Sequence, residues 1–312
     1  MGETHGLKRI KWSPALKGPN GTGQPLAGLG PLGGSPTVGL RPRLLTVHRF
    51  AVGTCPVSGS RARWRGGVRN EFFGDIRDYR KYGLLRILCG GKKASAAVCW
   101  MLRPDKGEPK PTRYLLRPET WRHFDARLFD ALRQAAVVEG ERNVARAEHP
   151  DVLDPAVFSF YKADFRSEFT ERRDYLRGFL ASAEGRELVF FDPDIGLEPR
   201  GAAAKRRRSV QHLYFDELAS AFDSGHSILV FQFFMAIAAE RVTSEKAYEV
   251  FSRLGAVEIA SFKTDKVIFF LIPQPQHVRQ MKERSVQVRS TWGKQIQPEW
   301  HSRTRGGRAE PR

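Results

Sequence analysis

Residues 188–198 have the sequence Leu188-Val189-Phe190-Phe191-Asp192-Pro193-Asp194-Ile195-Gly196-Leu197-Glu198, in which four apolar residues lead into a turn with three acids. A short apolar run bounded by turn residues on both sides predicts a strand buried on both faces. Apolar residues at helical spacing over 166–183 precede it, which predicts a helix followed by a turn and the buried strand. Helix and buried strand in succession are typical of an α/β domain.

The same alternation extends to both sides of this stretch. Upstream, apolar spacing predicts a helix from Asn70 that ends at Gly90-Gly91, a strand over 96–102, a short strand over 114–116 and a helix over 123–138. Downstream, it predicts a helix over 216–223, a strand over 228–231, a helix over 243–254 and strands over 257–262 and 267–272. Because only residues 263–266 separate the last two strands, we expect an antiparallel hairpin.

These elements predict a Rossmann-like three-layer α/β fold with a mostly parallel sheet and a C-terminal antiparallel hairpin. A doubly wound parallel sheet that ends in an antiparallel strand is the layout of S-adenosylmethionine-dependent methyltransferases. One fold of this kind carries many chemistries, so function has to be argued from the residues at its site.

Charge and composition divide the 312 residues into three regions. The whole chain has 52 Lys and Arg against 34 Asp and Glu, a net charge of +18. Residues 1–68 hold 14 of the 29 Gly, 7 of the 19 Pro and a single acid, and such a segment buries too little apolar surface to offset its chain entropy. We therefore predict a disordered leader over 1–68, as a targeting segment or the product of a misassigned start. A folded domain over 69–299 and a basic disordered tail over 300–312 follow.

Residue counts argue against several classes of protein. The three cysteines show no C-x-x-C spacing, which disfavours a disulfide scaffold and a cysteine zinc site. The eight histidines include no H-E-x-x-H pattern. No run of about 18 apolar residues occurs, so we expect no membrane partner, and a reducing cytoplasm is the expected location.

The acids of residues 192–198 form the first candidate site. A carboxylate at the carboxyl end of a buried parallel strand projects into the crevice where α/β sheets bind ligands. Asp192 and Asp194 flank a proline that fixes the turn, and Glu198 follows after Gly196. Three such acids could hold a cation, bind donors on a substrate, or form a structural junction in which Asp192 accepts backbone N–H groups.

The second candidate site is the helix start Phe73-Gly74-Asp75-Ile76-Arg77-Asp78-Tyr79-Arg80-Lys81-Tyr82-Gly83-Leu84-Leu85. At helical spacing Asp75, Asp78 and Tyr82 share one face, and Arg77 and Lys81 share another. Helix capping and solvated ion pairs also explain this pattern without any function.

Together the two segments carry a family resemblance. A pattern F-x-G-[N/D]-x-x-D-x-x-K-[H/Y]-x-x-L, followed further along the chain by an apolar strand ending in Asp-Pro, resembles the bacterial 23S rRNA adenine-N6 methyltransferase family. Here the two motifs lie at 72–85 and 188–194. The region 70–299 also resembles a group of bacterial proteins of unknown activity with the motifs F-G-D-I-x-D-x-x-K-Y-G-L-L-R and F-x-D-P-D-x-G-L-E.

The methyltransferase resemblance implies S-adenosylmethionine as cofactor. It implies that Asp192 accepts a hydrogen bond from the target amino group, with Asp194 beside it in the catalytic motif. Lys81 and Asp78 would lie near the cofactor or the target. This chain departs from the pattern because Asp194 and Ile195 stand where amino-methylating enzymes have a proline and an aromatic residue that stacks on the flipped base.

A second departure follows the first predicted strand, where methyltransferases have a Gly-rich turn. Residues 103–109 contain one glycine, and we expect a surface loop over 103–111. Asp105 is the candidate cofactor contact in this loop.

Basic residues upstream of the acidic motif and just after it are candidates to flank the crevice with positive charge. They are Arg103, Lys106, Lys110, Arg113, Lys205, Arg206, Arg207 and Arg208. Such a placement favours the phosphate backbone of RNA or DNA, and Glu198 with Arg206, Arg207 and Arg208 are the predicted substrate contacts. Gln232 and His226 are further site candidates, whereas the aromatic residues around Gln232 are expected in the core.

Three functions stay open on the sequence. The first is a divergent methyltransferase-like enzyme that acts on a nucleic-acid base, with Asp192 central. The second is a Mg²⁺-dependent phosphoesterase or nuclease in which Asp192, Asp194 and Glu198 hold the metal. The third is a degenerate Rossmann-like binding module without catalysis, favoured by the missing Gly-rich turn.

Overall fold

A computed structural model describes residues 69–90, 94–163, 165, 169–199, 209, 211–234, 239–303 and 309–311 of the chain. The leader predicted over 1–68 and the arginines at 206–208 lie outside the described residues. Within the described part, no helix combines the length and apolar character needed to cross a membrane.

A central sheet of eight strands organises the described residues, in the spatial order β10-β9-β7-β8-β6-β3-β1-β2. Its strands are β1 (Ala96–Cys99), β2 (Phe158–Phe160), β3 (Leu188–Phe191), β6 (Ser227–Phe233), β7 (Glu258–Lys263), β8 (Val267–Ile272), β9 (Gln297–Arg303) and β10 (Ala309–Pro311). A separate pair, β4 (Gly196–Leu197) and β5 (His212–Leu213), is parallel.

Strand directions confirm the predicted fold class. Strands β2, β1, β3 and β6 pair in parallel. Strand β8 is antiparallel to both β6 and β7, β9 is antiparallel to β7, and β10 is antiparallel to β9. All strands of the central sheet except β8 and β9 therefore point the same way, and β7 with β8 forms the expected hairpin.

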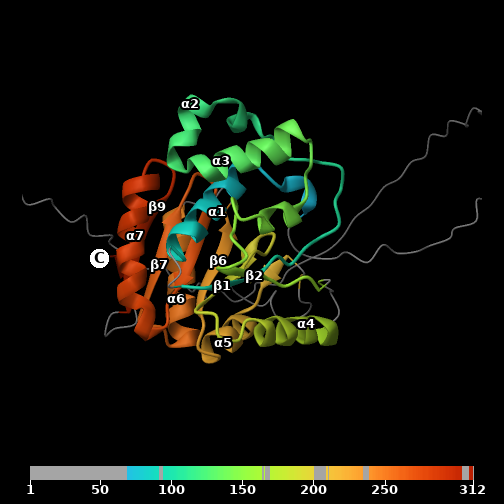
Figure 1. Ribbon diagram of the computed structural model, residues 1–312. Coiled ribbons are helices and arrows are strands. Elements are labelled where there is room, and N and C mark those ends of the chain that lie inside the picture. The colour runs from blue at the N-terminus through green and yellow to red at the C-terminus, as the bar shows by residue number, and fades with distance from the viewer. Residues whose placement is uncertain are drawn as a thin grey trace, which may run out of the picture. The chain divides into compact units, whose positions relative to one another are not determined.

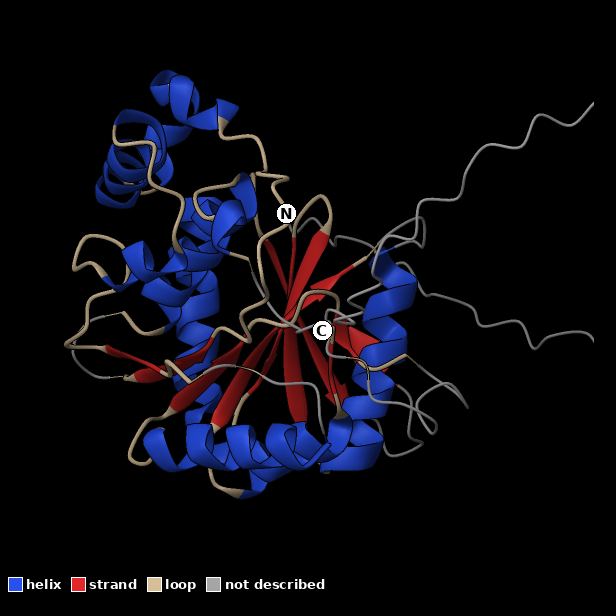
Figure 2. Ribbon diagram, turned by 90° about the vertical axis from the view of Figure 1, so that its right-hand side faces the viewer, coloured by secondary structure: helices blue, strands red, loops and turns tan. Residues whose placement is uncertain are grey.

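Helices cover both faces of the sheet, which gives three layers (Figures 1 and 2). One face carries α1 (Ile76–Leu88), α3 (Ala126–Arg133) and α7 (Val278–Trp292), and the other carries α4 (Phe169–Ser182), α5 (Phe215–Asp223) and α6 (Ala239–Leu254). Shorter helical segments are η1 (Asn70–Phe72), η2 (Arg113–Leu116), α2 (Pro118–Trp121), η3 (Arg122–Phe124), η4 (Gln134–Val138), η5 (Val144–Glu148) and η7 (Pro275–His277).

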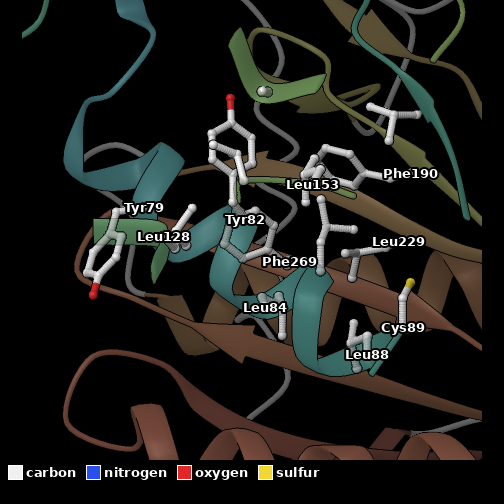
Figure 3. Close-up of a cluster of buried hydrophobic side chains, with 14 of the residues drawn as sticks. Tyr79, Tyr82, Leu84, Leu88, Cys89, Leu128, Leu153, Phe190, Leu229 and Phe269 are labelled. Carbon is white, nitrogen blue, oxygen red and sulfur yellow. The ribbon is translucent and has the colours of Figure 1, made fainter. Parts of the chain in front are cut away.

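Alternating strand residues supply two separate hydrophobic cores. In β3, Leu188 and Phe190 join the cluster under α1, α3 and α7, whereas Val189 and Phe191 join the cluster under α4, α5 and α6. All four are completely buried, as the continuous apolar run predicts. Figure 3 shows the first cluster, where α1 lays Tyr82 and other residues against the sheet.

Four differences from the sequence prediction lie in the segment from β1 to β2. The strand predicted over 114–116 is wrong, because this segment forms the 3-10 helix η2, with Leu115 buried and Leu116 exposed. The strand predicted over 96–102 ends at Cys99. The helix predicted over 123–138 is divided into η3, α3 and the π-helical turn η4, and β2 was not predicted at all.

The predicted C-terminal boundary at residue 299 is also wrong. Strand β9 runs through this position to Arg303 and pairs with β7 along its length. His301 is buried there, and its Nε2 lies 2.9 Å from Oγ of Ser261. Strand β10 lies inside the stretch predicted as a disordered tail. The apolar pattern over 297–303 is weak, so the sequence gives no clear signal for this strand. Its order comes from backbone pairing with β7.

Candidate active site at the carboxyl edge of the sheet

Asp192 lies at the carboxyl end of β3, where the parallel part of the sheet opens to ligands in this fold class. Its backbone N–H donates to the carbonyl oxygen of Cys99, which places it beside the end of β1. Because side chains alternate along a strand, Asp192 faces the same side as Phe190, toward α1. Its Oδ2 accepts a hydrogen bond from Nζ of Lys81 at 2.7 Å.

The start of α1 is built to present Lys81 to this carboxylate. Asp75 caps the helix, because its Oδ1 accepts from the backbone N–H groups of Arg77 at 2.8 Å and Asp78 at 3.0 Å. Asp78 in turn accepts from the backbone N–H of Gly74 at 3.0 Å and pairs with Nζ of Lys81 at 2.7 Å. One ammonium group is therefore held between two buried carboxylates.

Burial raises the pKa of two acids at this site, Asp192 and Asp75. Burial raises the pKa of Asp192 to about 6, although the nearby Lys81 ammonium opposes this shift. Burial and the neighbouring Asp78 raise the pKa of Asp75 to about 6 as well. Burial alone would lower the pKa of Lys81, but the charges of Asp192 and Asp78 outweigh it and raise this pKa. Lys81 is thus a permanent cation at neutral pH.

The structure does not bring the three predicted metal ligands together. Asp194 pairs with Arg103 and accepts from Nε2 of Gln211 at 3.2 Å. Glu198 accepts from the backbone N–H of Phe215 at 3.1 Å, and NH1 of Arg253 lies 3.1 Å from the same oxygen. Nor do any three His, Cys, Asp or Glu side chains of the described residues form a group suited to a metal ion. The metal-binding set Asp192, Asp194 and Glu198 is therefore a prediction that this geometry contradicts.

Gln232, a candidate from the sequence, shapes the turn after Asp192. Its Oε1 accepts from the backbone N–H of Leu197 at 2.9 Å, and its Nε2 donates to the carbonyl oxygen of Ile195 at 3.2 Å. Gly196 has a φ of 132°, and a Cβ at this position would lie 2.5 Å from the Gln232 side chain. Gln232 and Gly196 are a matched pair that fixes the path of the acidic loop.

The remaining predicted contacts lie apart from Asp192. Asp105 is exposed, and its Oδ1 accepts from the backbone N–H of Glu71 at 3.1 Å, so it fastens the loop after β1 to η1. Glu71 completes this fastening by accepting from the backbone N–H of Lys106 at 2.9 Å. His226 precedes β6 and so lies at the amino edge of the sheet, where its Nδ1 is 2.8 Å from the carbonyl oxygen of Arg186.

The turn after β1 contains a residue that sequence reasoning missed. Trp100 is 2% exposed, stacks on Phe160 and lies with its ring 5.6 Å from Nζ of Lys81. Its indole Nε1 is buried and has no hydrogen-bond partner among the described residues. Met101, the next residue, turns the chain with a φ of 49°, a conformation that glycine usually supplies. A lone tryptophan after a strand gave no signal of this in the sequence.

The described residues therefore define a Rossmann-like α/β protein with a buried acid-lysine-acid cluster at the carboxyl edge of its sheet. No family model matches the chain. No curated protein matches it either. Among solved structures, the chain is similar to the crystal structure of protein LPL1258 from Legionella pneumophila str. Philadelphia 1, of family-model DUF519. The identity is 10%, the TM-score is 0.39, and the match covers 73% of this chain and 97% of that one.

Proposed function

We propose that this chain is an S-adenosylmethionine-dependent methyltransferase that acts on an amino group of a nucleic-acid base. The observation that carries the proposal is the state of the Asp192 carboxylate. Lys81 binds Oδ2, and no described residue donates a hydrogen bond to Oδ1. A buried carboxylate that has one oxygen bound by a cation and no described donor on the other can accept a hydrogen bond from a substrate.

The surroundings of Asp192 fit a bound cofactor in one specific respect. The buried Nε1 of Trp100 is a donor without a described partner, and an acceptor on a ligand would satisfy it. When bound, S-adenosylmethionine supplies a methyl group attached to a positively charged sulfur. In this fold class the turn after the first strand contacts the bound nucleotide, and the position of Trp100 and Met101 directly after β1 supports the proposal.

Asp192 would act on the amino group of the target base. Its Oδ1 would accept a hydrogen bond from the amino N–H, which orients the nitrogen and increases its electron density. Lys81 would act as a positioning residue, because it holds Oδ2 and favours the charged carboxylate. Since the pKa of Asp192 is about 6, the rate of methyl transfer should rise as the pH increases through about 6.

Two measurements test this function. Calorimetric titration of the chain with S-adenosylmethionine should show stoichiometric binding, and radiolabelled S-adenosylmethionine should transfer its methyl group to an RNA or DNA pool. Asp192→Asn should retain cofactor binding and lose about 100-fold in transfer rate. The control is Asp130→Asn, which removes the charge of an exposed carboxylate on α3 that pairs with Arg122. This variant should change neither cofactor binding nor the transfer rate. Absence of both heat and transfer would contradict the proposal and favour a non-catalytic binding module.

A further inference from the structure

Arg77 and Phe233 form a pair beside Asp192 that the proposed reaction has not used. Arg77 lies one helical turn before Lys81 on α1, and its guanidinium carbon is 5.0 Å from the centre of the Phe233 ring. Phe233 is the last residue of β6 and is half-buried. No described carboxylate pairs with Arg77.

The register of the sheet places this pair on the same side as Asp192. Phe191 is the β3 partner of Val230 on β6, so Phe233 lies about two residues beyond the level of Asp192, or about 7 Å along the strand. Phe233 packs against the cluster under α1, as Phe190 does. Lys81 and Arg77, on one face of α1, therefore reach the ends of two adjacent strands.

The turn after Asp192 is attached to the same strand end. The backbone N–H of Phe233 donates to the carbonyl oxygen of Ile195 at 2.7 Å. Gln232, the residue before it, binds Leu197 and Ile195. The strand end that carries the half-buried ring is consequently joined to the turn after Asp192 by one backbone hydrogen bond and by the Gln232 side chain.

We propose that Phe233 and Arg77 form the surface on which the target base of a single-stranded nucleic acid stacks, so that its amino group meets Asp192. This inference rests on the proposed function. An aromatic ring and a guanidinium are both flat surfaces on which bases stack, and the positive charge of Arg77 also favours a nearby phosphate. Ile195 supplies no ring in the acidic loop, and β6 supplies one from the neighbouring strand.

The test uses the full chain and a single-stranded RNA pentamer with 2-aminopurine at its centre. Stacking of this base quenches its fluorescence, so wild-type protein should bind the pentamer and quench it. Phe233→Leu should weaken binding about tenfold and abolish the quenching, because stacking on one aromatic ring contributes an effect of this order. Arg77→Gln, at a partly exposed position, should weaken binding several-fold. It should not make the salt dependence of pentamer binding steeper.

The matched control is Phe234→Leu. Phe234 is the next residue, is also half-buried, and packs toward the opposite cluster, under α4, α5 and α6. It should bind and quench as the wild type does. Phe233→Tyr keeps a ring in the same place and should also retain quenching, which separates loss of the ring from loss of the fold.

The outcomes distinguish this inference from the proposed function. If the wild type does not quench the pentamer, or if Phe233→Leu and Arg77→Gln both bind it as the wild type does, the stacking surface is overturned. Quenching that depends on Phe233 in a chain that transfers no methyl group supports the surface and contradicts the reaction. Methyl transfer that is insensitive to both substitutions leaves the reaction standing and overturns the surface.

Discussion

Burial of Asp192 disfavours the charged form of its carboxylate. At the scale of single residues, the cluster contains the acids Asp75, Asp78 and Asp192 around the single ammonium of Lys81. Such a cluster needs its charges compensated by an opposite charge or by hydrogen bonds, since an uncompensated buried charge is strongly destabilising. This balance leads to two predictions about single substitutions.

The first prediction concerns the pH dependence of stability. The folded-state pKa of Asp192, about 6, lies above the ordinary value of 3.8, so the folded state binds this proton more tightly than the unfolded state. The stabilisation is fully present below pH 3.8 and is lost as the pH rises through about 6. The free energy of unfolding of the wild type, minus that of Asp192→Asn, should therefore fall by about 2 kcal/mol between pH 4 and pH 7.

Urea unfolding at a series of pH values measures this difference. Asp130→Asn is the control, because its ion pair with Arg122 holds the pKa of Asp130 below the usual range. The corresponding difference for Asp130 should not fall as the pH rises. A flat difference for Asp192 would show that Lys81 compensates its burial completely.

The second prediction concerns Lys81 itself. Lys81→Met leaves Asp78 and Asp192 buried without their cation and should lower the free energy of unfolding by about 3–5 kcal/mol. In an Asp192→Asn background the same change should cost at least about 1 kcal/mol less, because one of the two unpaired buried carboxylates is absent. Lys162→Met is the control: Lys162 is exposed in its pair with the half-buried Glu148, and its removal should cost less than about 1 kcal/mol. Additive effects of the two changes would contradict the coupling.

The sequence predicted these residues one at a time but not their contact. The strand end at Asp192 and the helix start with Asp78 and Lys81 each follow from local patterns. The two acids meet one lysine only because α1 packs across the end of β3, and no local pattern reports a contact over 111 positions. Trp100 was missed for the same reason, since its buried donor is defined by its neighbours in space.

At the scale of elements, α1 and α7 approach each other closely at one residue. Gly83 lies on α1, and a Cβ at this position would be 2.3 Å from the ring of Trp292, the last residue of α7. Trp292 is 1% exposed and also stacks on Phe124, so its ring has no room to move. This glycine thus sets the distance between two helices of one layer.

The third prediction follows from this contact. An alanine normally stabilises a helix relative to glycine by about 1 kcal/mol, but here overpacking should reverse the sign. Gly83→Ala should lower the free energy of unfolding by about 1–3 kcal/mol, as measured by urea titration. In a Trp292→Leu background the same substitution should be neutral or stabilising. A stabilised Gly83→Ala single variant would show that the helices separate easily.

Elements with a strong apolar period were predicted well, and those ordered by pairing were not. Strands β3 and β8 follow from continuous apolar runs, and helix α5 from its amphipathic spacing. Strand β2 has three residues, and β9 carries polar residues at most positions, so neither gives a clear period. Helix α7 has four buried residues among fifteen and was missed because its contact face is narrow.

At the scale of the whole described domain, the sheet decides where chemistry can occur. Its parallel strands β1, β3 and β6 end at one edge, and this edge receives Asp192 from β3, Trp100 from the turn after β1 and Phe233 from β6. Helix α1 adds Lys81 and Arg77 from the layer above. The site is thus built by elements far apart in sequence. Local patterns therefore predict the fold of the domain, but they do not predict which side chains meet at the site.

The last prediction concerns the far side of the sheet, where β9 extends it beyond β7. A chain that ends at Glu299 cuts this strand, whereas a chain that ends at Arg303 keeps it, and both lack 304–312. Loss of Trp300, of the buried His301 and of its contact with Ser261 should make the shorter chain less stable by about 3 kcal/mol. Urea unfolding of the two chains measures the difference directly. Equal stability would mean that β9 pairs without contributing to the core, and residue 299 would then be the functional boundary of the domain after all.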